Sequence, residues 1–299
     1  MGEEFWWFYD VIAVAVVMVS VFISAKKGVM KAILSLSAYA VAFVMAISLS
    51  SSLSGSLYKG TIRNSNIKKL DKTLSSVNYS LKMGTYLESL GYNVRVKIDY
   101  LDKIFKSGKN YDEQIYKYLN NINNKKVDNE TVFYDKLHDG YASLIHEIIS
   151  ENLSIYSAEY AAREIKEHPQ KMEELIPLML DIEDKIPAAK YIADNYIETP
   201  YKNTVRLTCF VLLLAVFLIV SLFLLRSLTD ERIGYQSIAS HITGGIFGVF
   251  KGAVLVFGIA VMVRLYVILG SDKMLFFNFK AIDKTYIFKY VYNFIMNNM

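Results

Sequence analysis

The stretch GGIFGVFKGAVLVFGIAVMV, residues 244–263, decides the fold of this chain. It is apolar and long enough to cross a lipid bilayer, which takes about 20 residues. It also holds Lys251 and a row of glycines at four-residue spacing, Gly244, Gly248 and Gly252. Residues four apart share one face of a helix, and glycine on that face lets a second backbone approach closely. The stretch therefore predicts a membrane helix that packs tightly against a neighbour.

Three further segments, residues 5–25, 32–49 and 207–225, have the length and composition of membrane-spanning helices. The aromatic residues that open the first segment are typical of the belt at a membrane surface. The chain of 299 residues is 53% hydrophobic, which is high for a soluble protein of this length. We therefore predict an all-α fold, a four-helix polytopic membrane bundle with a mostly helical soluble insertion between membrane helices two and three.

Changes in composition divide the chain into four parts. Membrane helices one and two occupy 1–50, the insertion 51–203, membrane helices three and four 204–270, and a tail 271–299. The tail has aromatic and apolar residues at helical spacing, but lysines interrupt it too often for a membrane span. We expect it to form an amphipathic helix in the membrane interface. The alternative is that this helix packs on the insertion and contacts no lipid.

Basic residues predict the orientation, because short cytoplasmic loops carry an excess of lysine and arginine. Lys26, Lys27 and Lys31 follow the first span, and Arg226 and Arg232 follow the third. Both loops are therefore expected in the cytoplasm, with the insertion and both termini outside. The tail is an exception to this pattern, since it also carries four lysines.

Small residues recur at four-residue spacing along one face of three of the predicted spans. The stripes are Ser20, Ser24 and Gly28 on the first span, Ala38, Ala42 and Ala46 on the second, and Gly244, Gly248 and Gly252 on the fourth. Inside lipid, helices associate through close van der Waals packing, so small faces favour contact. Structural packing is our leading interpretation of these stripes, and a pore lined by them is the alternative.

Three ionisable residues fall within the predicted spans: Asp10, Lys251 and Arg264. From the rise of a helix, Lys251 lies ~10 Å from the cytoplasmic boundary, Asp10 ~24 Å and Arg264 ~30 Å. Asp10 and Arg264 are therefore expected near the outer surface and within reach of one another. Lys251 shares its depth with Tyr39 and Ser35, which offer hydrogen bonds to its ammonium. Intramembrane charges are functional candidates by default, but these can reach the interface, so a structural role is an equal alternative.

The insertion reads mainly as helices. Apolar residues at helical spacing run through 67–81 and 149–165, whereas 92–100 alternates apolar and charged residues with the period of a strand. Lysine and arginine outnumber acids 14 to 6 in 51–126, and acids outnumber them 16 to 7 in 127–203. The two halves either pack on one another or present separate solvated faces.

The sequence has no residue spacing typical of a catalytic or metal site. His138 and His146 share a helical face, but their separation of ~12 Å along the helix is too large for one metal ion. A single cysteine, Cys209, excludes an intramolecular disulfide and a cysteine-based zinc cluster. We therefore expect no enzymatic activity and no cofactor. The net charge of +4 gives no reason to expect a nucleic-acid partner.

The order of these motifs resembles the colicin V production protein (CvpA-like) family. The resemblance lies in YDVIAVAVVMVSVFISAKKGVMKAILSLSAYAVAFVMA, residues 9–46, and in SIASHITGGIFGVFKGAVLVFGIAV, residues 237–261. The positions that match the family motifs are Asp10, Lys27, Gly28, Lys31, Gly248, Lys251 and Gly252. Ala32, where the family often has an acid, and the long insertion depart from the family pattern.

The resemblance implies a bacterial membrane protein of the cell envelope, in a family named for a requirement in peptide-toxin production. We therefore expect a non-enzymatic, multi-pass protein of the bacterial cell membrane that acts in envelope function or in colicin V-like toxin production or export. Its insertion would be an extracytoplasmic interaction module for a protein partner. The alternative is a small transporter or channel, in which several chains associate and Asp10, Lys251 and Arg264 line a path.

Overall fold

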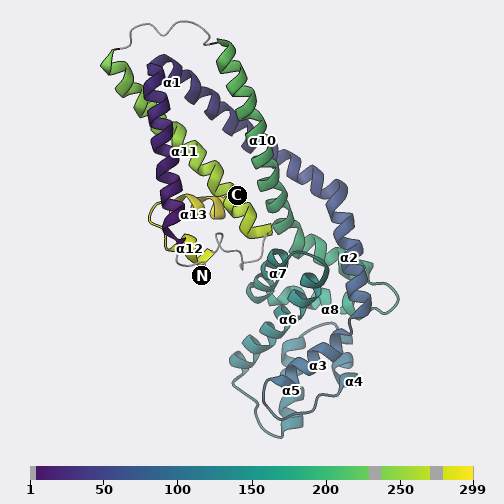
Figure 1. Ribbon diagram of the computed structural model, residues 1–299. Helices are drawn as coiled ribbons and strands as arrows, with labels where there is room; N and C mark the ends of the chain where they lie inside the picture. The colour runs from purple at the N-terminus through teal and green to yellow at the C-terminus, as the bar shows by residue number, and fades with distance from the viewer. Residues whose placement is uncertain (1–4, 229–236, 270–278, 299) are drawn as a thin grey trace. The chain divides into compact units, whose positions relative to one another are not determined.

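The computed structural model describes residues 5–228, 237–269 and 279–298, and every regular element in these ranges is a helix (Figure 1). Three helices are long and apolar enough to cross a membrane. The predicted all-α class is thus confirmed, and the apolar helices are compatible with a multi-pass membrane protein. Arg232, which entered the orientation argument, and Lys273, one of the four lysines of the tail, lie outside the described residues.

The chain divides into two compact units. We call Met1–Leu57 together with Lys202–Met299 the apolar unit, and Tyr58–Tyr201 the helical module. The apolar unit is built from α1 (Trp7–Leu57), most of α10 (Glu198–Leu228), α11 (Ile238–Leu269), α12 (Phe279–Asp283) and α13 (Phe288–Asn298). The helical module lies within the insertion expected at 51–203, and α1 continues as a helix to Leu57.

A break at Gly28 divides α1 into a first limb, 7–27, and a second limb, 29–57. The backbone there has a φ of 75° and a ψ of 171°, which are not helical values. Glycine reaches positive φ without strain because it has no Cβ. Figure 1 shows α1 reversing direction within its length, so its two limbs form a hairpin.

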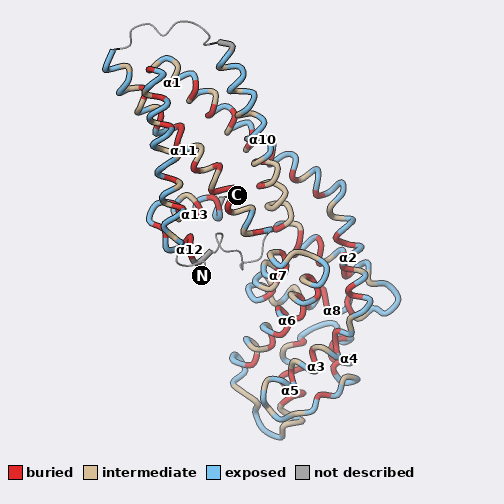
Figure 2. The backbone as a smooth tube through the Cα atoms, in the orientation of Figure 1, coloured by how far each residue is buried: buried red, intermediate tan, exposed pale blue. Residues whose placement is uncertain are grey.

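In α1 small residues are buried and large apolar residues are exposed, which is the opposite of the pattern in a helix of a soluble protein. The buried residues are small or tyrosine: Tyr9, Ala13, Ser20, Ser24, Gly28, Ala32, Ser35, Tyr39, Ala42, Ala46, Ser50 and Ser54. Large apolar side chains point outward instead, and Met18, Phe22 and Val44 are 66%, 71% and 61% exposed. Figure 2 shows the buried positions recurring along α1 and α11. Helices that pack through small faces and turn apolar side chains outward are typical of a lipid environment.

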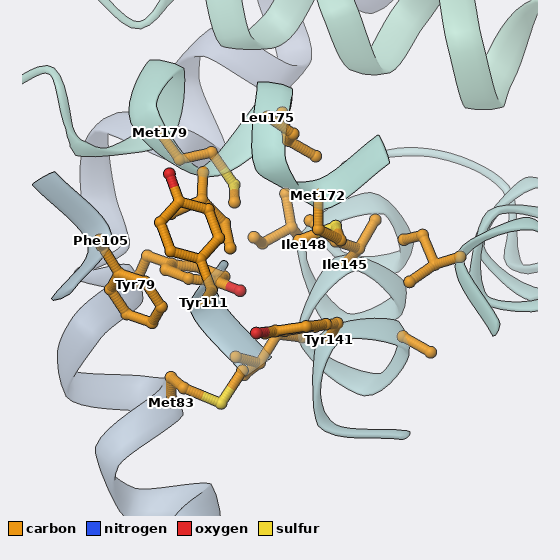
Figure 3. Packing of buried hydrophobic residues seen from close by; sticks show 14 of the residues in the cluster. Tyr79, Met83, Phe105, Tyr111, Tyr141, Ile145, Ile148, Met172, Leu175 and Met179 are labelled. Carbon is orange, nitrogen blue, oxygen red and sulfur yellow. The ribbon is translucent and has the colours of Figure 1, made fainter. Parts of the chain in front are cut away.

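The helical module consists of short helices around one core. They are α2 (Arg63–Ser76), α3 (Tyr79–Ser89), α4 (Ile98–Lys106), α5 (Tyr111–Asn123), α6 (Glu130–Asn152), α7 (Ile155–Glu167), a 3₁₀ turn (Pro169–Lys171), α8 (Met172–Leu180) and α9 (Ile186–Ile192). Figure 3 shows Tyr79, Tyr111 and Tyr141 packed with aliphatic and methionine side chains in this core. Because each buried aromatic removes about 150–250 Å² from water, such a core is sufficient to hold a domain of this size together.

Two π-helical turns mark the points where the chain enters and leaves the helical module. They are Tyr58–Ile62 and Ala193–Ile197. The Tyr58 hydroxyl donates to the Ala193 carbonyl oxygen at 3.0 Å, and the Arg63 guanidinium donates two hydrogen bonds of 2.7 Å to the Asp194 carboxylate. A bidentate pair of this kind fixes geometry as well as charge, so it ties the two turns together.

The prediction of a strand at 92–100 is wrong. Residues 93–97 form an irregular segment in which Asn93 has a φ of 56°; the segment has no partner strand among the described residues, and α4 begins at Ile98. Side chains satisfy the backbone instead: the Val96 N–H donates to Glu88 Oε1 at 2.7 Å, and the Lys97 N–H donates to the Tyr118 hydroxyl at 2.8 Å. The apolar alternation reflects a connecting segment that turns Val96 into the core, since this side chain is only 7% exposed.

Each of the two predicted helical faces is divided between two helices. In the first, α2 ends at Ser76 and Val77 is extended, so Leu81 belongs to α3 and is exposed. In the second, α6 ends before Leu153, and the Ser154 hydroxyl accepts the Ser157 N–H to start α7. Helical spacing alone does not mark such breaks, because the apolar period continues across them.

The basic and acidic halves of the insertion share one core and are joined by ion pairs. Arg63 pairs with Asp194 at 2.7 Å and Lys82 with Glu147 at 2.5 Å. These side chains are partly exposed, so each pair contributes only about 0.2–1 kcal/mol. The shared core therefore holds the basic and acidic halves together, and the ion pairs add a small contribution.

Candidate functional site

The glycine row of α11 lies directly against the first limb of α1. A Cβ added to each glycine would lie 2.7 Å from the Ser24 carbonyl oxygen at Gly244, 2.6 Å from Val21 Cα at Gly248, and 2.8 Å from Val17 Cα at Gly252. Carbon atoms in proteins make van der Waals contact at about 3.5–4.0 Å, so none of these positions has room for a side chain. The two backbones are in contact along two turns of helix.

The small residues of α1 take the positions that this contact requires. Ser20 and Ser24 of the first limb are 4% and 2% exposed, and Gly28 at the turn is buried. On the second limb Ala42 and Ala46 are buried and Ala38 is half-buried. The contact with the glycine row therefore uses small residues of the first limb, and small residues are also buried on the second limb.

The turn at Gly28 is fastened to the start of α11. Because the helix is broken there, the Val29 N–H donates to the Ser240 hydroxyl at 3.1 Å. The Ala25 carbonyl oxygen lies 2.8 Å from His241 Nδ1. Ser240 and His241 thus satisfy backbone groups that the break would leave without partners. Lys27 beside the turn is exposed, and Lys31 is half-buried.

The side chain of Lys251, on α11, is buried and lies against the second limb of α1. Its side chain is only 7% exposed, and its ammonium nitrogen lies 4.4 Å from the centre of the Tyr39 ring. A cation over an aromatic face is stabilised by the ring quadrupole, more strongly where water is excluded. The expected neighbour, Tyr39, therefore meets Lys251 through its ring face.

Asp10 binds the beginning of α13. Its carboxylate accepts three backbone N–H groups, from Tyr286 at 2.7 Å, Ile287 at 3.0 Å and Phe288 at 2.9 Å. The first N–H groups of a helix have no partner within the helix, and a carboxylate placed there also complements the helix dipole. Asp10 thus acts as the cap of a helix that is distant in the sequence.

Arg264 also contacts the tail. Its Nη1 atom lies 3.4 Å from the Tyr292 hydroxyl, and its guanidinium lies 5.9 Å from the centre of the Tyr292 ring. Phe288, Tyr292 and Ile295 are at most 1% exposed, whereas Tyr290 is 70% and Phe294 58% exposed. Helix α13 therefore packs one face on the other helices of the apolar unit and turns an aromatic face outward.

The helical module has an open cleft of about 580 Å³ between α2, α4, α8 and the loop after α8. We call it the acidic cleft, because Asp71, Asp102, Glu183 and Asp184 line it against two lysines, Lys106 and Lys185. Its size falls within the range of about 300–1,000 Å³ that is usual for binding pockets. Ile182 on the same lining is 89% exposed, so the cleft offers apolar as well as acidic contacts.

Some polar groups of the acidic cleft already have hydrogen-bond partners within the protein, and others do not. Burial lowers the pKa of Lys185, which nearby Asp181 partly offsets, and its ammonium donates to the Met179 carbonyl oxygen at 2.5 Å. Asp102 accepts a hydrogen bond from Ser80. The buried Tyr79 hydroxyl has no hydrogen-bond partner among the described residues. Asp184 accepts the Ile186 N–H at 2.8 Å. Lys185, Asp102 and Asp184 therefore serve the fold, while Asp71 and Glu183 are available to a ligand.

His138 and His146 do not act together. His138 Nε2 lies 2.7 Å from an Asp112 carboxylate oxygen and its ring stacks between Tyr134 and Tyr141. This arrangement is a local hydrogen bond between α5 and α6. Within the described residues, no group of three metal-ligating side chains gathers.

Comparison with family models, with curated proteins and with solved structures finds no match to this chain.

Sequence reasoning missed several of the residues that build these sites. Ser240 and His241 were part of a quoted motif, but only the three-dimensional structure brings them to the Gly28 turn. The acidic cleft was missed because its walls come from three separate segments of the sequence, 71–79, 102–106 and 179–186. A local signal was available in DIEDK, residues 181–185, where a single isoleucine, Ile182, lies among acidic residues.

Proposed function

We propose that this chain is a multi-pass membrane protein that holds a helical binding module outside the cytoplasm. The observation that carries the membrane assignment is the inverted burial of α1, in which small residues face the protein and large apolar ones face outward. Such a surface is stable in lipid and would aggregate in water. The three long apolar helices support the same assignment.

The proposed topology has four crossings, because the break at Gly28 lets α1 cross twice. The first limb is roughly 30 Å long at 1.5 Å per residue, which matches the hydrocarbon core of a bilayer. Lys26, Lys27 and Lys31 lie around the break, so the positive-inside rule puts it in the cytoplasm. The helical module and the tail are then extracytoplasmic.

The helical module is proposed to bind a peptide segment that is cationic and partly apolar. Four carboxylates in the acidic cleft favour positive charge, and exposed Ile182 favours an apolar side chain. Asp71 and Glu183 have no hydrogen-bond or ion-pair partner among the described side chains, so their charges are free for a ligand. The resemblance to the colicin V production protein family suggests the process, envelope function or the production or export of a toxin peptide.

A binding role has more support than the alternative role of a transporter or channel. The alternative requires Asp10, Lys251 and Arg264 to line a path between helices. Asp10 instead accepts three backbone N–H groups, Lys251 lies on the Tyr39 ring, and Arg264 lies at Tyr292. Their contacts are those of residues that hold helices together.

The peptide proposal predicts a charge-dependent interaction at the acidic cleft. The double variant Asp71→Asn with Glu183→Gln should weaken binding of a fluorescent lysine–leucine amphipathic peptide to the full chain in detergent about fivefold. This corresponds to about 0.5 kcal/mol for each exposed charge pair. Fluorescence anisotropy measures the change in Kd.

The matched control is Asp135→Asn with Glu151→Gln, two exposed carboxylates on α6 outside the cleft. It should leave the peptide Kd within twofold of the wild-type value. Equal weakening by both double variants would mean that the peptide senses only net charge, and the acidic cleft would not be its site.

A further inference from the structure

A second cavity of about 470 Å³ lies in the apolar unit, among α1, α10, α11 and α13. Its lining residues are Phe43, Ile47, Arg206, Ala253, Val254, Phe257 and Phe294, so every lining side chain except that of Arg206 is apolar. The rings of Phe43 and Phe257 meet edge to face at 5.0 Å, and those of Phe257 and Phe294 at 6.1 Å. We call this cavity the arginine pocket.

Arg206 has an unsatisfied hydrogen-bond donor at this pocket. Its Nε atom is buried and has no hydrogen-bond partner among the described residues. An unpaired buried donor on a charged group is costly, and a negatively charged oxygen removes that cost. Among the described residues that line the pocket there is no carboxylate. An anion from a bound ligand would supply the missing partner.

The position of Arg206 along α10 restricts the source of that anion. The residue directly precedes the apolar run 207–225, so it lies where a membrane span meets the interface. Lipid phosphates lie at this depth, and the acyl chains begin beside it. Arginine suits a phosphate because its guanidinium presents several donors in one plane.

We propose that the arginine pocket binds one anionic phospholipid, whose phosphate pairs with Arg206 and whose acyl chain lies on Phe43, Val254 and Phe257. Bound in this way, the lipid contacts α1, α10, α11 and α13 together. It would thus join the α1–α11 pair to α10 and to the tail. The proposal rests on the membrane position of the apolar unit given above.

Native mass spectrometry of the full chain in detergent tests the proposal. The protein is delipidated and offered equal amounts of phosphatidylglycerol and phosphatidylcholine, whose headgroups differ in net charge. The wild type should retain one phosphatidylglycerol at about a tenfold preference, the factor expected for a charge-assisted hydrogen bond. Arg206→Gln should reduce the preference to about one.

Ala253→Phe tests the apolar part of the site independently, because Ala253 is exposed on the pocket wall and a phenyl ring there fills the space. This variant should lose the retained lipid whatever its headgroup. Arg226→Gln, at the other end of α10, is the control and should keep the wild-type preference.

Four results would overturn the proposal: an unchanged preference in Arg206→Gln, unchanged retention in Ala253→Phe, equal retention of the two lipids by the wild type, or displacement of the lipid by millimolar inorganic phosphate. Failure of the membrane assignment itself would look different. The wild type would then remain monodisperse after detergent removal, whatever its lipid preference.

Discussion

Gly248→Leu is expected to prevent folding of the apolar unit, and Gly248→Ala to destabilise it by about 1–3 kcal/mol through overpacking. Even the single Cβ of alanine would lie 2.6 Å from Val21 Cα and 2.7 Å from the Ser20 carbonyl oxygen. Both are backbone atoms, so a rotamer change cannot relieve the overlap. The helices must separate instead, which removes the close packing on which association in lipid depends. Thermal denaturation in detergent measures the loss.

Gly245→Ala is the matched control, one residue past Gly244 on the same helix. Its added Cβ would meet only side-chain carbons, Val21 Cγ1 at 3.6 Å and Ala25 Cβ at 3.7 Å, which is ordinary contact. We expect a stability equal to or above that of the wild type, since alanine favours a helix by about 1 kcal/mol over glycine. Equal melting temperatures for Gly245→Ala and Gly248→Ala would rule out backbone contact at Gly248.

Asp10→Ala is expected to release the C-terminal helix α13. Three backbone N–H groups lose their acceptor, and loss of a helix cap alone costs up to about 2 kcal/mol. The amides of α13 should therefore exchange with solvent about 30-fold faster, because opening becomes easier by that free energy. Hydrogen exchange read by mass spectrometry on the peptide that covers 286–298 measures the change.

Asp283→Ala serves as the control, because it removes an exposed carboxylate from the same tail. It should leave exchange in α13 unchanged. Asp10→Asn retains one acceptor oxygen without the charge and should give an intermediate rate. An Asp10→Ala variant with wild-type exchange in α13 would mean that packing of Phe288 and Tyr292 alone holds the tail.

The sequence was sufficient to predict the helical class, because the apolar runs are long and their small residues follow helical spacing. It also predicted which face of α11 is packed, since Gly244, Gly248 and Gly252 share one side of a helix. It did not identify the partner of that face. Small residues occur on both limbs of α1, and only the fold shows that Val17 and Val21 of the first limb meet the glycines.

Contacts between distant residues were beyond local patterns. Depth in the membrane predicted a position for Asp10 but not its hydrogen bonds with the N–H groups of Tyr286, Ile287 and Phe288. Every residue except proline has a backbone N–H, so the residue type does not indicate which N–H groups Asp10 will bind. The prediction of a strand at 92–100 was wrong because it too used side chains alone. Alternation describes side chains, but a strand also needs a partner backbone, which a pattern in one segment cannot supply.

The most direct test of the proposed topology is cysteine accessibility in intact cells. In a Cys209→Ala background, one variant carries Lys27→Cys at the Gly28 turn and another carries Lys125→Cys at an exposed position of the helical module. A membrane-impermeant maleimide should label position 125 from outside and position 27 only after lysis. Labelling of both positions from the same side would contradict the double crossing of α1, and labelling of position 27 alone would reverse the orientation.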